Sequence, residues 1–326
     1  MKVSCLDLPR TNSLAPAASF GPLGRRRWKG SPQTLKGHWF AQALLARWQR
    51  YLQQLEECRH EASTEAIHQL RVAIRRLISQ LFVLGAVLPG SKCQRACRIL
   101  KRQRQSLGPL RDLHIQRRFA EGLEARFPEA VILSVELSRQ ERALLKPVSR
   151  RINHNKSSKL ERWINRIISD LEQTITETPE HEQLTGFALC CADSAFSETV
   201  QRRRLIVLSD SRTIHRTRAA FKKFRYIVEC LPPDITGLSK RQLRNLSYYQ
   251  RRMGNIQDLV VIQKGVSEFV RQHKALELWL RPFCAYLRRR QGRALRSFEK
   301  SIDKLFQFWP PPGLPVASVS DAQCPA

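Results

Sequence analysis

Acidic residues are scarce in this chain of 326 residues, which carries 28 Asp and Glu against 57 Lys and Arg. The formal net charge is +29, and such an imbalance causes self-repulsion unless an acidic partner neutralises it. Nucleic acids, anionic membrane surfaces and inorganic polyanions are the candidate partners. A single acidic protein partner fits less well, because the basic residues are spread over the whole chain.

Long apolar segments are also missing. No run of about 18 apolar residues occurs, so the sequence predicts no transmembrane helix. Residues 1–33 contain scattered Pro, Gly and Ser together with Arg25, Arg26 and Arg27, but no apolar core of a secretion signal. We therefore expect a cytoplasmic protein with a disordered basic tail over residues 1–33 and a flexible tail over residues 309–326.

The nine cysteines include no Cys-x-x-Cys pair and no ligand spacing with His. Cys93 and Cys97 lie four residues apart on a predicted helix, but no second pair completes a zinc site. We expect buried free thiols in a reducing compartment, with no metal site and no cofactor. The chain also lacks a Walker A loop, and we predict no catalytic residue.

Strand patterns are absent as well, because no segment combines period-two alternation with turn dipeptides. Amphipathic helical segments joined by short loops follow one another instead, which is typical of antiparallel bundles and predicts an all-α fold. We expect helix breaks at residues 107–109 and 253–255, where glycine occurs, and a polar linker at residues 153–158.

One basic helical pattern occurs twice. At about 100° per residue, its His and basic side chains share one face and its apolar side chains share the opposite face. The first copy has His68, Arg71, Arg75 and Arg76 opposite Leu70, Ile74, Leu77 and Leu81. The second copy has His215, Arg218, Lys222, Lys223 and Arg225 opposite Phe221, Phe224 and Val228.

The two halves of the chain match beyond this pattern. The two His motifs are 147 residues apart, and several flanking residues recur with a displacement of 146. These flanking residues are Arg95, Arg98, Leu100, Gly108 and Asp112, which correspond to Arg241, Arg244, Leu246, Gly254 and Asp258. A register held over about 45 residues predicts an internal duplication with two pseudo-symmetric bundles, over about residues 34–152 and 159–308.

These motifs resemble the CHAD family, the conserved histidine α-helical domain. The likeness covers residues 34–308 and rests on three patterns in order: His-x-x-Arg-Val-x-x-Arg-Arg, Leu-Gly-x-x-Arg-Asp, and His-x-x-Arg-x-x-x-Lys-Lys-x-Arg-Tyr. The resemblance implies two pseudo-symmetric helical bundles that bind inorganic polyphosphate on a basic surface between them, and association with polyphosphate granules. One departure is Gln257, which stands where the first copy has Arg111.

Polyphosphate offers only oxygen atoms, so its recognition needs many charge-assisted hydrogen bonds, for which the planar fork of Arg is well suited. We expect a cleft between the repeats that is lined from both sides. One side is predicted to carry His68, Arg71, Arg75, Arg76, Arg95, Arg98 and Arg102. The other is predicted to carry His215, Arg218, Lys222, Lys223, Arg225, Arg241, Arg244 and Arg251.

Several alternatives stay open at this point. His68 and His215 either contact phosphate or only set the angles of their helices, and Asp112 and Asp258 either cap helices or orient arginines. A nucleic-acid-binding protein would also explain the charge, although no helix-turn-helix, RRM, KH or OB signature is visible. A phosphate-processing enzyme is a further alternative, but neither a metal site nor the Glu-x-Glu-x-Lys motif of triphosphate-tunnel domains is present. The sequence leaves the oligomeric state open.

Overall fold

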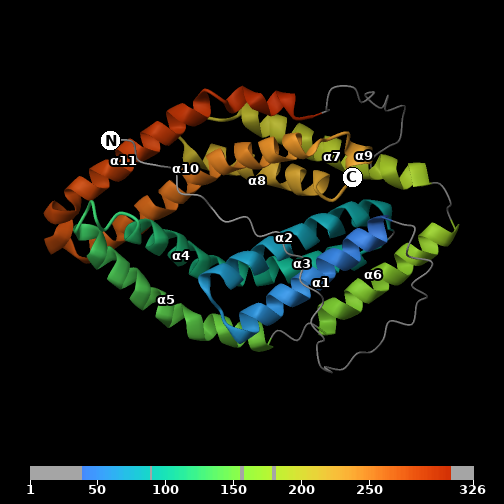
Figure 1. Ribbon diagram of the computed structural model, residues 1–326, viewed down its shortest axis with the longest axis horizontal. Coiled ribbons are helices and arrows are strands. Elements are labelled where there is room, and N and C mark those ends of the chain that lie inside the picture. Colours follow the sequence, from blue (N-terminus) through green and yellow to red (C-terminus); the bar gives the residue numbers. More distant parts are fainter. Residues whose placement is uncertain (1–38, 89, 155–157, 178–180, 310–326) are drawn as a thin grey trace, which may run out of the picture.

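The computed structural model describes residues 39–88, 90–154, 158–177 and 181–309, and in this part of the chain all regular structure is helical. The prediction of an all-α fold is confirmed. The molecule is elongated, with two groups of helices that lie against each other and extend into long arms, which meet again at one end (Figure 1). The two predicted tails lie outside the described residues, apart from Trp309.

The first group of helices follows the chain from α1 to α6. The helix α2 begins at a serine cap, because the Ser63 hydroxyl accepts a hydrogen bond from the backbone N–H of Ala66 at 3.2 Å. The helices of this group are α1 (Trp39–His60), α2 (Thr64–Val87), α3 (Lys92–Ser106), α4 (Gly108–Glu121), α5 (Glu129–His154) and α6 (Ser158–Glu177).

The second group repeats much of this order and contains the longest helix, α10. A capping box at Ser239 begins its longest helix, since Ser239 and Gln242 satisfy each other's backbone N–H groups. The helices are α7 (His181–Arg204), α8 (Ser211–Val228), α9 (Pro233–Thr236), α10 (Lys240–Gln272) and α11 (Glu277–Glu299), with 3-10 turns at Lys274–Leu276 and Ile302–Gln307.

Equivalent helices pack in equivalent pairs. In the first group α1 packs on α2, α2 on α3 and α4 on α5; in the second group α7 packs on α8, α8 on α10 and α10 on α11. The groups meet where α2 contacts α7 and α8 and where α4 contacts α10 (Figure 1). The arrangement as two pseudo-symmetric bundles is confirmed, whereas their origin by duplication stays a prediction. The helix α6, which begins the predicted second repeat, packs on α3 and α1.

The predicted helix break at residues 253–255 is wrong. Gly254 lies inside the continuous helix α10, which corresponds to α3 and α4 joined end to end. In the first half the break occurs because Pro109 has no backbone N–H to continue the hydrogen-bond ladder. In the second half Asn255 keeps this N–H, and a glycine alone costs a helix only about 1 kcal/mol.

Two apolar cores hold the helices in place. The larger core includes helices of both groups, and the predicted apolar faces of α2 and α8 are buried in it. Complete burial of such a side chain contributes about 1.5–3 kcal/mol. The smaller core joins α4 and α5 to α10 and α11 through residues such as Leu133, Phe269 and Phe283. Because α2 and α8 are anchored by their apolar faces, their His/Arg faces point away from the core.

Three further expectations concern membranes, metals and thiols. Within the described ranges, no helix is both long and apolar enough to cross a bilayer. Over the same ranges, no three His, Cys, Asp or Glu side chains come together to hold a metal ion. The thiols of Cys58, Cys93 and Cys230 are buried outside any disulfide, as expected, whereas Cys190 is exposed.

Candidate anion-binding site

Six basic side chains from four helices lie close enough for their charges to act on one another. We call them the central cluster: Arg71 and Arg75 on α2, Arg104 on α3, Arg111 on α4, and Arg218 and Lys222 on α8. The charge of Arg75 acts on both Arg218 and Lys222, so α2 and α8 bring the two halves of the chain together here. Basic residues that are far apart in the sequence are therefore brought together in space by the contacts between these helices.

The same local geometry positions one arginine in each half. A Cβ atom at Gly108 would lie 3.8 Å from Arg71 Nη1, and a Cβ atom at Gly254 would lie 3.4 Å from Arg218 Nη2. Each guanidinium thus lies against a helix backbone that glycine leaves uncovered. One turn further along the helix, a carboxylate attracts each arginine: Asp112 acts on Arg71, and Asp258 acts on Arg218.

One direct hydrogen bond ties the cluster to α3. Arg71 Nη1 donates to the backbone oxygen of Arg104 at 2.8 Å, close to the end of that helix. The carbonyl groups in the last turn of a helix lack partners within the helix and carry partial negative charge. This contact fixes the guanidinium of Arg71 beside the side chain of Arg104.

Burial and mutual repulsion make the cluster electrostatically unfavourable by itself. Burial, followed by the charges of Arg218 and Arg75, lowers the pKa of Lys222 to about 6. Burial also lowers the pKa of Arg71, to about 10. The carboxyl groups of Asp112 and Asp258 are themselves partly desolvated, which raises their pKa values. With Glu65, which acts on Arg111, three carboxylates face six basic groups, and this leaves a surplus of positive charge that an anionic ligand would neutralise.

Two buried donors in this cluster are unused. Within the part of the chain that the structure describes, Arg75 Nε and Arg218 Nε have no hydrogen-bond partner. A buried donor without an acceptor is unfavourable by about 1–3 kcal/mol, so such atoms mark places where an acceptor fits. Beside them lies a cavity of about 330 Å³ whose basic lining residues are Arg75, Lys101, Arg104, Lys222 and Lys223.

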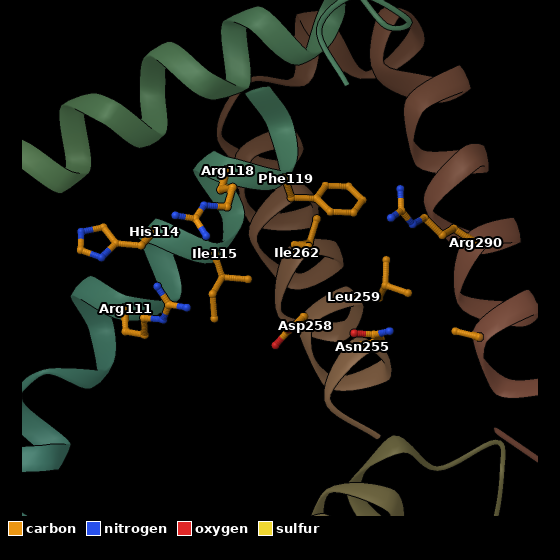
Figure 2. Close-up of a pocket in the computed structure, with 11 residues that line it drawn as sticks. Arg111, His114, Ile115, Arg118, Phe119, Asn255, Asp258, Leu259, Ile262 and Arg290 are labelled. Carbon is orange, nitrogen blue, oxygen red and sulfur yellow. The ribbon is translucent and has the colours of Figure 1, made fainter. Parts of the chain in front are cut away.

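A second cavity, of about 480 Å³, adjoins the cluster between α4, α10 and α11 (Figure 2). Arg111 and Arg118 stand on α4, Asp258 and Asn255 on α10, and Arg290 on α11 (Figure 2). Because Arg111 also belongs to the central cluster, this cavity borders the cluster.

Comparison with known proteins identifies the domain. The CHAD domain family matches residues 41–265, more than half of the chain. The chain belongs to the CHAD domain family. The crystal structure of the CHAD domain from the plant Ricinus communis is similar in fold, with a TM-score of 0.62 at 19% sequence identity, covering 81% of this chain and 90% of that one. A comparison with curated protein sequences finds no match.

The structure of this CHAD domain brings some predicted site residues together and separates others. Arg71, Arg75, Arg218 and Lys222 belong to the central cluster, and Lys223 lines the adjoining cavity. The strongest charges acting on the cluster come from residues outside the predicted strips of α3 and α10. Six predicted residues lie exposed on those two helices: Arg95, Arg98, Arg102, Arg241, Arg244 and Arg251.

Two predicted basic residues pair with the same carboxylate, although the charge of Arg225 also acts on Arg218 in the cluster. Arg225 Nε lies 3.2 Å from Glu229, and Arg76 Nε lies 4.0 Å from the same side chain. Together with Arg47 and Arg50, Arg76 lines a separate cavity of about 410 Å³. Arg76 follows Arg75 by one residue, so on a helix it points about 100° away from the cluster.

The two motif histidines have different surroundings. His215 is exposed, and its Nδ1 lies 2.9 Å from Gln257 Oε1, which ties α8 to α10. His68 is half-buried, and its pKa is lowered by burial and then by the charge of Arg111, the counterpart of Gln257. The two halves therefore match: His68 lies near Arg111, which precedes Asp112, and His215 lies near Gln257, which precedes Asp258.

The basic region also contains three arginines that the sequence patterns do not predict. Arg104 and Arg111 belong to the central cluster, and Arg118 lines the second cavity. On α3 the predicted residues Arg95, Arg98 and Arg102 lie about 120° around the helix from Arg104 and Lys101. Because both faces carry basic residues, the sequence did not show which face points to the cluster. Arg111 had a signal, since it lies in the repeated Leu-Gly-x-x-Arg-Asp turn.

Replacing Lys222 with Met should stabilise the ligand-free protein. The pKa of Lys222 is about 6 in the fold against its ordinary value of 10.5, so the unfolded chain holds the proton more firmly. The resulting destabilisation is complete below pH 6 and disappears as the pH rises towards 10.5. At pH 6 we expect Lys222→Met to raise the melting temperature by about 5 °C, with a smaller increase at pH 9. Thermal unfolding at both pH values, without phosphate in the buffer, measures this; an equal or lower melting temperature at pH 6 would contradict it.

Proposed function

We propose that this CHAD domain binds inorganic polyphosphate without catalysis, with the central cluster as its main contact. The observation that carries the proposal is the meeting of six basic side chains from both halves with fewer carboxylates beside them, namely Asp112, Asp258 and Glu65 among the described residues. The CHAD resemblance implies the same ligand. Binding to polyphosphate granules would follow from affinity for the polymer.

A linear phosphate polymer suits the arrangement of the basic region. Its negative charges repeat at short intervals, so one chain can contact Lys222, Arg75 and Arg111 in succession. The unpartnered Nε atoms of Arg75 and Arg218 are donors for its oxygens. The exposed arginines of α3 and α10, including Arg98 and Arg244, would add long-range attraction that depends on salt.

A competition experiment distinguishes polyphosphate from nucleic acid. We expect long-chain polyphosphate to displace a labelled single-stranded or duplex oligonucleotide at a phosphate-equivalent concentration at least about tenfold below that of unlabelled oligonucleotide, because the cluster offers charge without base-specific contacts. Fluorescence anisotropy at fixed ionic strength measures both competitors. Stronger displacement by nucleic acid would favour a nucleic-acid-binding domain.

The proposal that binding is non-catalytic has its own test. The purified domain would be incubated with long-chain polyphosphate and with tripolyphosphate, in the presence of Mg²⁺, Mn²⁺ or Ca²⁺. We expect no release of orthophosphate above the protein-free control and no shortening of the polymer on a gel. Release that scales with the amount of protein would show the domain to be an enzyme.

A further inference from the structure

The second cavity has an apolar wall that polyphosphate would not use. Ile115 and Phe119 on α4 face Leu259 and Ile262 on α10, below Arg290 on α11 (Figure 2). A chain of phosphates presents only charged oxygens, which gain nothing from apolar surface. The cavity beside Lys222 has apolar lining of its own, in Ile78 and Phe82, but the second cavity adds the polar groups of Asn255 and Asp258 to its apolar wall. Arg111 links the second cavity to the central cluster.

Arg290 is held in a fixed orientation at this wall. Its Nη1 donates to the Tyr286 hydroxyl at 2.9 Å, and its guanidinium carbon lies 4.8 Å from the centre of the Phe119 ring. A guanidinium plane fixed in this way presents a flat cationic surface to the cavity. Nucleobases stack on arginine planes and on aromatic rings in this manner.

Polar groups at the foot of the cavity match a sugar and a base edge. Asn255 carries both a donor and an acceptor, and Asp258 carries a carboxylate beside it (Figure 2). A carboxylate repels phosphate but accepts hydrogen bonds from sugar hydroxyls. On the opposite side, Arg111 and Arg118 provide charge for phosphates at the edge of the central cluster.

We propose that the second cavity is an accessory site for a nucleoside polyphosphate such as ATP. The base lies against the apolar wall and the plane of Arg290, the ribose meets Asn255 and Asp258, and the phosphates extend past Arg111 towards the cluster. A volume of about 480 Å³ falls within the usual range for small-molecule sites, about 300–1,000 Å³. This inference needs the cluster to attract phosphate groups, but it does not require long-chain polyphosphate to be the natural ligand.

Comparing ATP with tripolyphosphate tests the inference, because the two carry similar triphosphate chains and differ in the nucleoside. We expect ATP to bind at least about tenfold more tightly than tripolyphosphate in calorimetry at equal ionic strength without divalent metal. Substituting Arg290→Lys keeps the charge and removes the plane, so ATP affinity should fall by about tenfold while tripolyphosphate affinity changes by less than about twofold. Phe119→Ala should have the same selective effect.

Tyr248→Ala is the matched control. Tyr248 also lies beneath a guanidinium group, with Arg252 Cζ 5.6 Å from its ring centre, but it lines neither of these two cavities. Its removal should leave ATP affinity unchanged. Equal affinities for ATP and tripolyphosphate, or equal losses of both ligands in Arg290→Lys, would overturn the accessory site.

Long-chain polyphosphate, titrated in parallel, separates this inference from the proposed function. Weak binding of the polymer together with selective ATP binding would refute the proposed function and support the nucleotide site. Tight binding of the polymer without preference for ATP over tripolyphosphate would support the proposed function and refute the nucleotide site.

Discussion

Neutralising the central cluster should lower the affinity for long-chain polyphosphate by at least about a thousandfold. The variant replaces Arg71, Arg75, Arg218 and Lys222 with Gln. Each of these groups can form charge-assisted hydrogen bonds worth about 1.5–3 kcal/mol, and every 1.4 kcal/mol changes affinity tenfold. Helicity should be retained, because Gln removes charges that repel one another and leaves the apolar faces of α2 and α8 intact. Calorimetry measures the affinity and circular dichroism measures the helicity.

A second quadruple variant controls for net charge. It replaces Arg98, Arg102, Arg241 and Arg244 with Gln, which removes the same number of basic side chains from exposed positions on α3 and α10. We expect its affinity to fall by less than about tenfold, since exposed charges act mainly through screened, long-range attraction. Equal losses in the two variants would mean that binding depends on the total charge of the surface and that the cluster is not a site.

Polyphosphate affinity should fall steeply as the pH rises above 6. Lys222 has a pKa of about 6 in the free protein, because burial and the neighbouring arginines disfavour its charge. Bound phosphate favours the charged form and raises this pKa, so binding takes up a proton. Each pH unit above 6 should therefore weaken binding by up to about tenfold, or about 100-fold between pH 6.5 and 8.5. Calorimetry in two buffers of different ionisation enthalpy should show uptake of about one proton at pH 8.

Lys222→Arg isolates the contribution of this one side chain. Arginine keeps its charge over the whole range, so the variant should bind with an affinity that is nearly independent of pH between 6.5 and 8.5. Long polymers are the suitable ligands, because only their chain ends titrate near neutral pH. The same pH dependence in the wild type and in Lys222→Arg would show that Lys222 is not part of the binding site.

Local signals in the sequence account for most of the fold. The apolar faces of α2 and α8 are buried as the sequence predicts, and both Ser63 and Ser239 cap helices, as serine commonly does. The continuity of α10 was also within reach of the sequence, because Asn255 keeps the backbone N–H that Pro109 lacks. The position of α6 against α3 could not be predicted from the sequence, since the apolar face of α6 is compatible with any partner of matching shape.

The sequence pointed to some members of the basic cluster and not to others. The motifs on α2 and α8 predicted basic residues opposite an apolar stripe, and the structure brings four of them together, namely Arg71, Arg75, Arg218 and Lys222. On α3 that rule failed, because Arg98 and Arg102 lie on one face and Lys101 and Arg104 on another. Arg290 carried no signal of its own, and its position depends on the tertiary contacts with Tyr286 and Phe119.

The sequence by itself determined that this chain forms helices, that α2 and α8 each bear a basic face, and that the surplus of positive charge calls for an anionic partner. These properties depend on residue type and on spacing along a single helix. Only the tertiary structure decided that Arg75 acts on Lys222, that Arg104 and Arg111 join them, and that an apolar wall adjoins the cluster. The reason is physical: repulsion and burial depend on distances between helices, and packing of the shared core sets those distances.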